Sequence, residues 1–253
     1  MRAFEAKATA PLLPLRVVTD RNRGGVYLGI GLAMIAMFAQ FLFLAYYLQL
    51  VKGYSPLMSG VAFLPMTICL TIGSTQIGAR LMNRVPARLL MVPGLLATAI
   101  AMVLLAQLTP NSSYWALILP AQVLLGLGVG TAFTPAMNIA TYGVRPHDAG
   151  IASAMLNTSQ QVGGSIGTAL LNTIAASATT SWIAAHASNS TNATELSQQA
   201  AVHGYTTAFW WAAGILTLAA VIVAACVRTG TTGRPPIETT ADGNGTTAPV
   251  MTH

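Results

Sequence analysis

The sequence predicts an all-α integral membrane protein with six transmembrane helices, and three observations lead to this prediction. Hydrophobic residues make up 54% of the 253-residue chain and charged residues only 7%, while the mean hydropathy is +0.61. Ordinary soluble domains carry about 25% charged residues, so this chain has too few charges to cover a surface that faces water. The apolar residues gather into long stretches, and the basic residues are sorted between the two sides of these stretches.

Six apolar stretches follow one another along the chain, each near the ~20 residues that a helix needs to cross the hydrocarbon layer. They cover residues 26–51, 56–78, 89–107, 115–142, 149–176 and 205–227. We expect these stretches to form one transmembrane domain, residues 26–227. Residues 1–25 precede it as a polar cytoplasmic lead-in. Residues 228–253 follow it as a cytoplasmic tail rich in Thr, Gly and Pro, a composition that predicts disorder.

The stretch at residues 149–176 is the least apolar of the six, but its pattern suits a membrane helix. At about 100° per residue, one face of this helix is apolar and the other is polar without any charge. The apolar face carries Ile151, Met155, Val162, Ile166 and Leu170. The polar face carries Ser153, Asn157, Gln160, Gln161, Gly164, Thr168 and Asn172. We therefore expect the first face to meet lipid and the second to point toward a cavity or toward neighbouring helices.

The distribution of basic residues supports six crossings. If all six stretches cross, eleven of the twelve Lys and Arg residues lie on one side of the membrane, and only Lys52 lies on the other. If residues 149–176 did not cross, Arg228 and Arg234 would move to the side of Lys52. Because basic residues favour the cytoplasmic side, the sequence predicts that both termini are cytoplasmic. The Ser-, Thr- and Asn-rich segment 177–204 is then a polar connection on the outer side.

The ionisable residues exclude several classes of function. All six acidic residues and all four histidines fall outside the predicted spans: Glu5, Asp20, Asp148, Glu195, Glu238, Asp242, His147, His186, His203 and His253. The spans therefore offer no acid–base pair, activated nucleophile or metal cluster, and we expect no catalytic residue, no metal and no enzyme. A proton-driven machine would need a titrating group on another segment. The net charge of +6 could suggest a nucleic-acid partner. We expect none, because the distribution of the basic residues between the two sides of the membrane already accounts for this charge.

Several segments resemble the C-terminal half of the fourteen-helix drug:proton antiporters (EmrB/QacA type) of the major facilitator superfamily. The most specific segment, residues 148–170, is similar to the next-to-last helix of that family, which typically reads A-G-x-A-S-x-x-x-N-x-x-x-Q-x-G-G-x-x-G. Residues 126–135 resemble the preceding helix. Residues 12–22 and 46–60 resemble the ninth helix and its outer loop. The resemblance covers about residues 12–227 and implies a six-helix, C-terminal domain of a transporter of this superfamily.

The loop at residues 79–88 resembles the cytoplasmic signature of the superfamily, roughly G-x-L-x-D-R-x-G-R-R. The matching positions are Leu81, Arg84 and Arg88, and the departures are Ala79, Asn83 and Pro86. In the family this loop latches helix ends together through an Asp–Arg network. The resemblance implies such a latch at Arg80, Asn83, Arg84 and Arg88, weakened because a neutral amide bonds arginine about half as strongly as a carboxylate. Alternatively, the arginines only anchor the topology.

Polar side chains on the expected cavity side are candidates for the substrate path. They are Ser153, Asn157, Gln160, Gln161, Thr168 and, on the preceding stretch, Asn138. The amides could instead link neighbouring helices by hydrogen bonds, and both interpretations stay open. We assign one set of glycines to close helix packing rather than to substrate contact: Gly126, Gly130, Gly163, Gly164 and Gly167. The many methionines suit an adaptable apolar cavity, but we favour positions that face lipid or fill the core: Met34, Met37, Met66, Met102, Met137 and Met155.

The resemblance implies the C-terminal half of a secondary exporter of amphipathic or cationic small molecules in the plasma membrane. No cofactor is expected, because in the family the proton gradient supplies the energy. The expected partners are the lipid bilayer, a drug-like substrate and a missing N-terminal half, since one domain alone would expose its polar cavity face to lipid at a large cost. We therefore expect a fragment of a longer transporter. The alternatives are a half-sized membrane module that partners or regulates an intact transporter and, least favoured, a membrane enzyme.

The charge distribution leads to a testable topology. We expect Arg145 and the tail after Arg228 to face the cytoplasm, and Ser190 to face outward. Single cysteines placed at residues 145 and 190 in a background without Cys69 and Cys226 can be labelled with a membrane-impermeant maleimide on intact cells. Residue 190 should label and residue 145 should not. The reverse pattern would overturn the topology.

Overall fold

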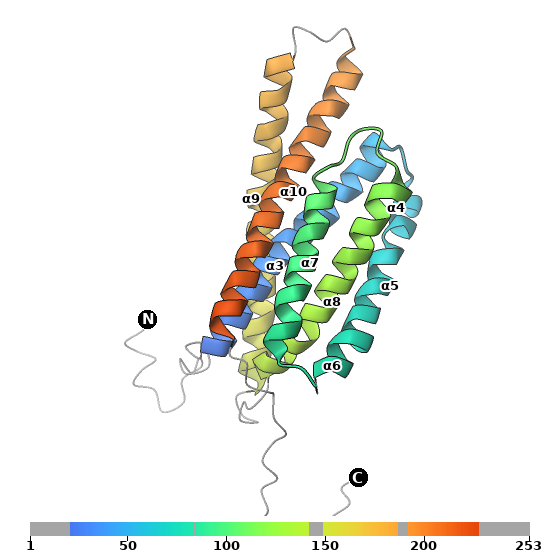
Figure 1. The fold of residues 1–253 in the computed structure, drawn as a ribbon. Coiled ribbons are helices and arrows are strands. Elements are labelled where there is room, and N and C mark those ends of the chain that lie inside the picture. Colours follow the sequence, from blue (N-terminus) through green and yellow to red (C-terminus); the bar gives the residue numbers. More distant parts are fainter. Residues whose placement is uncertain (1–20, 83, 142–148, 187–191, 228–253) are drawn as a thin grey trace, which may run out of the picture.

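The computed structural model describes residues 21–82, 84–141, 149–186 and 192–227. Every regular element within these residues is a helix, so the predicted all-α fold class is confirmed (Figure 1). Several expectations fall outside the described residues: most of the lead-in before residue 21, Asn83, the loop that contains Arg145, and the tail 228–253.

The helices pass through one bundle six times, in alternating directions (Figure 1). In chain order they are α3 (Arg21–Tyr46) with η1 (Tyr47–Val51); α4 (Pro56–Ala62), α5 (Leu64–Ile72), η2 (Gly73–Ala79) and α6 (Arg80–Met82); α7 (Ala87–Leu105); η3 (Tyr114–Ile118) with α8 (Leu119–Thr141); α9 (Ala149–His186); and α10 (Ala193–Cys226). The η elements are π-helical turns that continue the neighbouring α-helices. The first four passes begin and end within about five residues of the predicted stretches.

Five of the described helical stretches are long and apolar enough to cross a membrane by length and composition: 21–51, 56–82, 87–105, 114–140 and 193–226. Helix α9 is not among them, although it has 38 residues. The uncharged polar residues along one side of α9 lower the mean hydropathy of this helix. The crossing of α9 stays a prediction from the distribution of basic residues.

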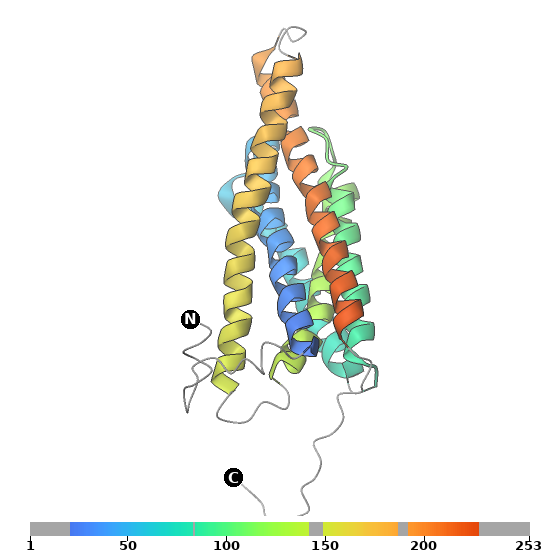
Figure 2. The same cartoon turned by 90° about the vertical axis from the view of Figure 1, so that its left-hand side faces the viewer.

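The segment 177–204 was expected to be a polar connection, and the structure corrects this expectation. Helix α9 continues to His186, and α10 begins at Ala193, where the side chain of Asn192 accepts a hydrogen bond from the backbone N–H of Thr194 (3.1 Å). The polar composition indicated exposure to water but not the absence of a helix, since Ala, Gln and Leu favour helices. The two helix ends form a hairpin that projects beyond the other helices (Figures 1 and 2).

The two ends of the bundle differ in charge. Helix α3 starts at Arg21, and its continuation η1 is capped by Lys52 at the other end of the pass. Because the passes alternate in direction, the turn after α6 and the start of α7 lie at the same end of the bundle as Arg21. We name this the arginine end, with Arg21, Arg23, Arg80, Arg84 and Arg88. The opposite end, with Lys52 and the α9–α10 hairpin, is the hairpin end. These names describe the structure and assign no side of the membrane.

Helices α3, α9 and α10 pack against one another, and α8 packs against both α5 and α7. Contacts of α10 with α7 and of α3 with α8 join the two groups. Aromatic side chains fill the centre of the first group. The ring of Phe43 lies 5.5 Å from that of Tyr205 and meets Phe209 edge-on at 6.1 Å. At the arginine end, the guanidinium of Arg21 donates a hydrogen bond to the carbonyl of Ala225 (2.8 Å). This contact caps the C-terminal turn of α10 with a positive charge.

Helix α8 approaches α5 closely through its glycines. A Cβ atom on Gly126 would overlap the carbonyl oxygen of Met66 and lie 2.9 Å from the Cβ of Cys69. A Cβ atom on Gly130 would overlap the carbonyl oxygen of Leu70. Small residues at these positions therefore set the distance between the two helices, as is common between helices in lipid.

This close approach predicts that Gly126→Ala lowers the stability of the fold by about 1–3 kcal/mol, because the neighbour is backbone and cannot move aside easily. The matched control is Gly214→Ala, on the exposed side of α10, where an added Cβ meets nothing within 4 Å. Thermal unfolding in detergent micelles measures both variants. We expect a lower Tm for the first and an unchanged or raised Tm for the second. Equal Tm values would contradict the packing role.

Candidate functional site

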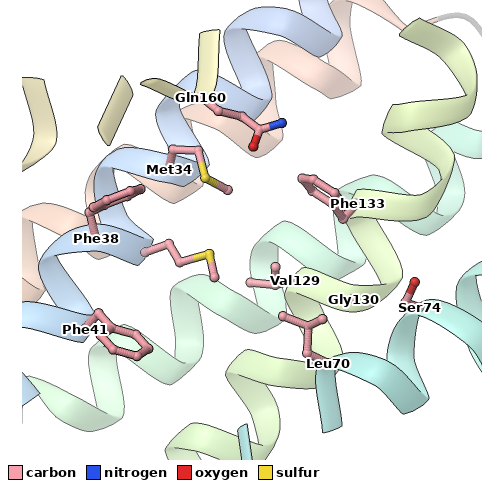
Figure 3. Close-up of a pocket in the computed structure, with 10 residues that line it drawn as sticks. Met34, Phe38, Phe41, Leu70, Ser74, Val129, Gly130, Phe133 and Gln160 are labelled. Carbon is pink, nitrogen blue, oxygen red and sulfur yellow. The ribbon is translucent and has the colours of Figure 1, made fainter. Parts of the chain in front are cut away.

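A cavity of about 400 Å³ lies among α3, η2 with α5, α8 and α9 (Figure 3). We call it the α3–α8 cavity. Its lining residues are Met34, Met37, Phe38, Phe41, Leu70, Ser74, Val129, Gly130, Phe133 and Gln160. Its volume falls within the range of about 300–1,000 Å³ that is usual for small-molecule pockets. The cavity is therefore large enough to hold a drug-sized molecule.

The lining is apolar apart from two groups, the amide of Gln160 and the hydroxyl of Ser74. Figure 3 shows the amide of Gln160 reaching from α9 into the space between Met34 and Phe133. The methionine side chains are flexible and polarisable, so they adapt to ligands of different shape. The phenylalanine rings offer flat apolar surfaces. None of the lining residues carries a charge, so the cavity suits an apolar or amphipathic ligand with one or two hydrogen-bonding groups.

The wall of the cavity at Ser74 is fixed by hydrogen bonds between η2 and α8. The hydroxyl oxygens of Ser74 and Thr134 lie 2.7 Å apart, and the Thr134 hydroxyl is also 3.2 Å from the carbonyl oxygen of Ser74. One residue earlier, a Cβ atom on Gly73 would lie 2.7 Å from the carbonyl oxygen of Leu127. The π-helical turn η2 therefore lies directly against α8, and π-helical turns are frequent at functional sites.

Helix α9 presents three faces rather than the two expected. One face packs against α3: a Cβ atom on Gly163 would overlap the carbonyl oxygen of Gly31, and a Cβ atom on Gly167 would lie 2.5 Å from the Cα atom of Ile35. A Cβ atom on Gly164 would meet the ring of Phe38 at 2.9 Å. The second face is apolar and exposed, with Val162, Ile166 and Leu170 between 44% and 52% exposed. The third face is an exposed polar stripe.

The structure brings only one of the six candidate path residues to the α3–α8 cavity, namely Gln160. The polar stripe of α9 holds Asn157, Gln161 and Thr168, all exposed, and Ser153 is exposed too. Asn138 is half-buried on α8 and does not line the cavity. The expected polar face is split because Gln161 lies about 100° around the helix from Gln160. The stripe therefore faces away from this cavity.

Sequence reasoning did not single out the aromatic residues of the cavity, Phe38, Phe41 and Phe133. The available signal was their spacing, because Met34, Met37, Phe38 and Phe41 recur every three or four residues and so share one face of α3. The ring of Phe41 also stacks on that of Phe63, with centroids 4.5 Å apart. Such an apolar face in a membrane helix does not reveal whether it meets lipid, a neighbour or a cavity.

The candidate latch residues lie at the arginine end. Arg80 and Arg84 are exposed and Arg88 is half-buried. Backbone N–H groups of Arg84 and Val85 donate to the carbonyl of Leu81 (2.9 and 2.8 Å), which forms a tight turn after α6. Because Asn83 is outside the described residues, the latch stays a prediction.

Comparison with known proteins finds a matching family and several relatives of the chain. The model of the family described as "Major Facilitator Superfamily" matches residues 2–168. The chain is 46% identical over 220 residues to the puromycin resistance protein pur8 of Streptomyces alboniger, covering 86% of this chain and 43% of that protein. It is 35% identical over 172 residues to the cephamycin export protein CmcT of Amycolatopsis lactamdurans, covering 68% of this chain and 35% of that protein.

A third relative is the tetracenomycin C resistance and export protein of Streptomyces glaucescens, 32% identical over 178 residues, which cover 68% of this chain and 32% of that protein. The matched region is thus less than half of the length of each of these three relatives.

Proposed function

The chain belongs to the major facilitator superfamily, and we propose that it is the C-terminal half of a multidrug-type exporter of amphipathic or cationic small molecules. It is an integral membrane transport protein rather than an enzyme, since the relatives named above are resistance and export proteins. The observation that carries the proposal is the α3–α8 cavity, which combines flexible apolar walls with the single amide of Gln160.

The exposed polar stripe of α9 supports the missing-half part of the proposal. Asn157, Gln161 and Thr168 are exposed on this helix, and amides that face hydrocarbon without partners cost several kcal/mol each. In transporters built from two domains, the substrate path lies between the domains. A second six-helix domain set against α9 would cover the stripe and complete the path.

The names of the relatives guide the choice of substrate. They refer to resistance to puromycin and tetracenomycin C and to export of cephamycin. We propose that the complete transporter exports small organic compounds of this kind. The finer assignment to the EmrB/QacA type, with fourteen helices and proton antiport, rests on the sequence resemblance.

The charges in this half suggest how the exporter would be driven. No residue that lines the α3–α8 cavity titrates near neutral pH, and Glu195 is the only carboxylate within the described residues. It lies at the first turn of α10, at the hairpin end. A proton-coupled exporter therefore needs its titrating group on another segment, which we place in the N-terminal half. We also propose that the arginine end faces the cytoplasm.

The alternative is a half-sized module that partners or regulates an intact transporter, with the polar stripe as its docking face. Expressing the chain alone tests whether it exports by itself. Neither the half-transporter nor the regulatory module should do so, whereas an autonomous exporter would. We expect membrane insertion without resistance to puromycin, because the cavity has no titratable group that could couple export to a proton gradient. Efflux from vesicles driven by a pH gradient would overturn the proposal. An effect only on the activity of an intact transporter would favour the module.

Within a complete transporter, Gln160→Leu should change the set of exported compounds. The substitution removes the amide from the cavity, and losing one hydrogen bond to a ligand costs about 0.5–1.5 kcal/mol, or roughly 2–10-fold in affinity. The matched control is Ile166→Leu, on the exposed apolar face of the same helix, which should leave export unchanged. Resistance profiles compared at equal membrane abundance measure both. A changed profile for Ile166→Leu beside an unchanged one for Gln160→Leu would show that the helix faces are assigned wrongly.

A further inference from the structure

A second hollow lies at the hairpin end and differs from the α3–α8 cavity in its chemistry. It is a groove of about 690 Å³ between the first turns of α10, the end of α9 and the connection from α7 to η3. We call it the hairpin groove. Its lining residues are Leu108, Thr109, Pro110, Asn111, Trp182, Glu195, Gln198, Gln199, Val202, His203 and Thr206. Most of these are polar, whereas the α3–α8 cavity is almost entirely apolar.

One side of the groove is a single face of α10. Its residues follow one another at spacings of three and one, so that positions three or four apart share one helix face: Glu195, Gln198, Gln199, Val202, His203 and Thr206. This face belongs to the projecting hairpin that Figures 1 and 2 show. Helix α10 is about 51 Å long and the hydrocarbon layer about 30 Å thick. The groove therefore lies where water reaches it.

The opposite walls are held in place by contacts within the protein. The indole of Trp182 stacks on the imidazole of His186, with ring centroids 4.1 Å apart, and contacts the tilted imidazole of His203 at 4.5 Å. On the other side, the hydroxyl of Tyr47 donates a hydrogen bond to the carbonyl of Thr109 (2.7 Å), and the hydroxyl of Ser112 accepts one from the N–H of Thr109 (2.9 Å). The groove thus has a preformed aromatic wall and a preformed loop wall.

The negative charge of Glu195 indicates which kind of ligand the groove would bind. Glu195 is exposed and is the only carboxylate of the described chain, while Lys52 is the only Lys or Arg of the described chain at the hairpin end. A groove lined by both a carboxylate and aromatic rings favours a cation. One carboxylate is too few for a metal, and within the described residues no cluster of three or more His, Cys, Asp or Glu side chains could hold one. The amides of Asn111, Gln198 and Gln199 add hydrogen-bonding groups for amino substituents.

We propose that the hairpin groove is a second binding site that takes flat organic cations, separate from the α3–α8 cavity. Glu195 faces the charge of the ligand, the Trp182–His203 wall contacts its aromatic part, and the amides bind its amino groups. Its use in export rests on the proposed function: a cation that leaves the cavity at the hairpin end would be held at this water-facing site. Binding itself does not depend on transport and can be measured on this chain.

The test uses the purified chain in detergent micelles with ethidium, a flat aromatic cation that carries two amino groups. Its neutral reduced form, dihydroethidium kept under nitrogen, has the same ring framework without the charge. Equilibrium dialysis gives the Kd of each probe for the unchanged chain, Glu195→Gln, Lys52→Gln and Ile166→Leu. The Lys52 variant controls for the net charge of the hairpin end. The Ile166 variant, on the exposed apolar face of α9, controls for a substitution outside both hollows.

We expect Glu195→Gln to weaken ethidium binding about fivefold, equivalent to about 1 kcal/mol, and to leave dihydroethidium unaffected. Added salt should weaken ethidium binding to the unchanged chain and should matter less for Glu195→Gln. Lys52→Gln should leave the ethidium affinity equal or higher, and Ile166→Leu should leave it unchanged.

Three results would overturn the proposal. The first is that the unchanged chain does not bind ethidium, and the second is that both probes bind equally. The third is that Ile166→Leu or Lys52→Gln weakens ethidium binding as much as Glu195→Gln does. A complete transporter that exports no drug while this chain still binds ethidium through Glu195 would refute the proposed function and leave the groove standing.

Discussion

The close contact of helix backbones at glycines is the constraint on which the rest of the structure depends. Between helices in lipid there is little hydrophobic driving force, so packing at small residues decides which surfaces meet. Gly163 and Gly167 bring α9 onto α3, and Gly126 and Gly130 bring α8 onto α5. The α3–α8 cavity lies among these four helices, and Gly130 forms part of its wall. The size of the cavity therefore follows from how closely the two helix pairs approach.

The break in the second pass adds a further constraint on the cavity. Pro65 has no N–H to donate, and α4 ends at Ala62 just before it. The carbonyl of Ala62, at the end of α4, accepts hydrogen bonds from the hydroxyl of Tyr114 (2.8 Å) and the amide of Gln122 (2.9 Å). Both donors belong to the fourth pass. These bonds tie the interrupted second pass to η3 and α8, where α5 approaches the glycines of α8.

The two hollows of the protein differ because their surroundings differ. The α3–α8 cavity is lined by methionine and phenylalanine, and its polar groups are Gln160 and Ser74. The hairpin groove lies where α9 and α10 project past the other helices, and a carboxylate and several amides line it. A cation that passes from the first to the second would exchange apolar contact for a charge partner in water.

The sequence by itself determined the membrane class, the all-α fold and the extents of the first four passes, because these depend on composition and on the lengths of apolar stretches. It could not decide which amide of α9 meets the cavity: Gln160 and Gln161 are adjacent in the chain, and only the contact of Gly163 with α3 turns the first inward and the second outward. Nor did it predict the helical hairpin, since polar composition in 177–204 reports exposure to water rather than backbone conformation. Tertiary structure decided these points because the surroundings of a side chain depend on segments that are distant in the chain. Phe38 and Phe133 line one cavity, and Glu195 lines the same groove as Thr109.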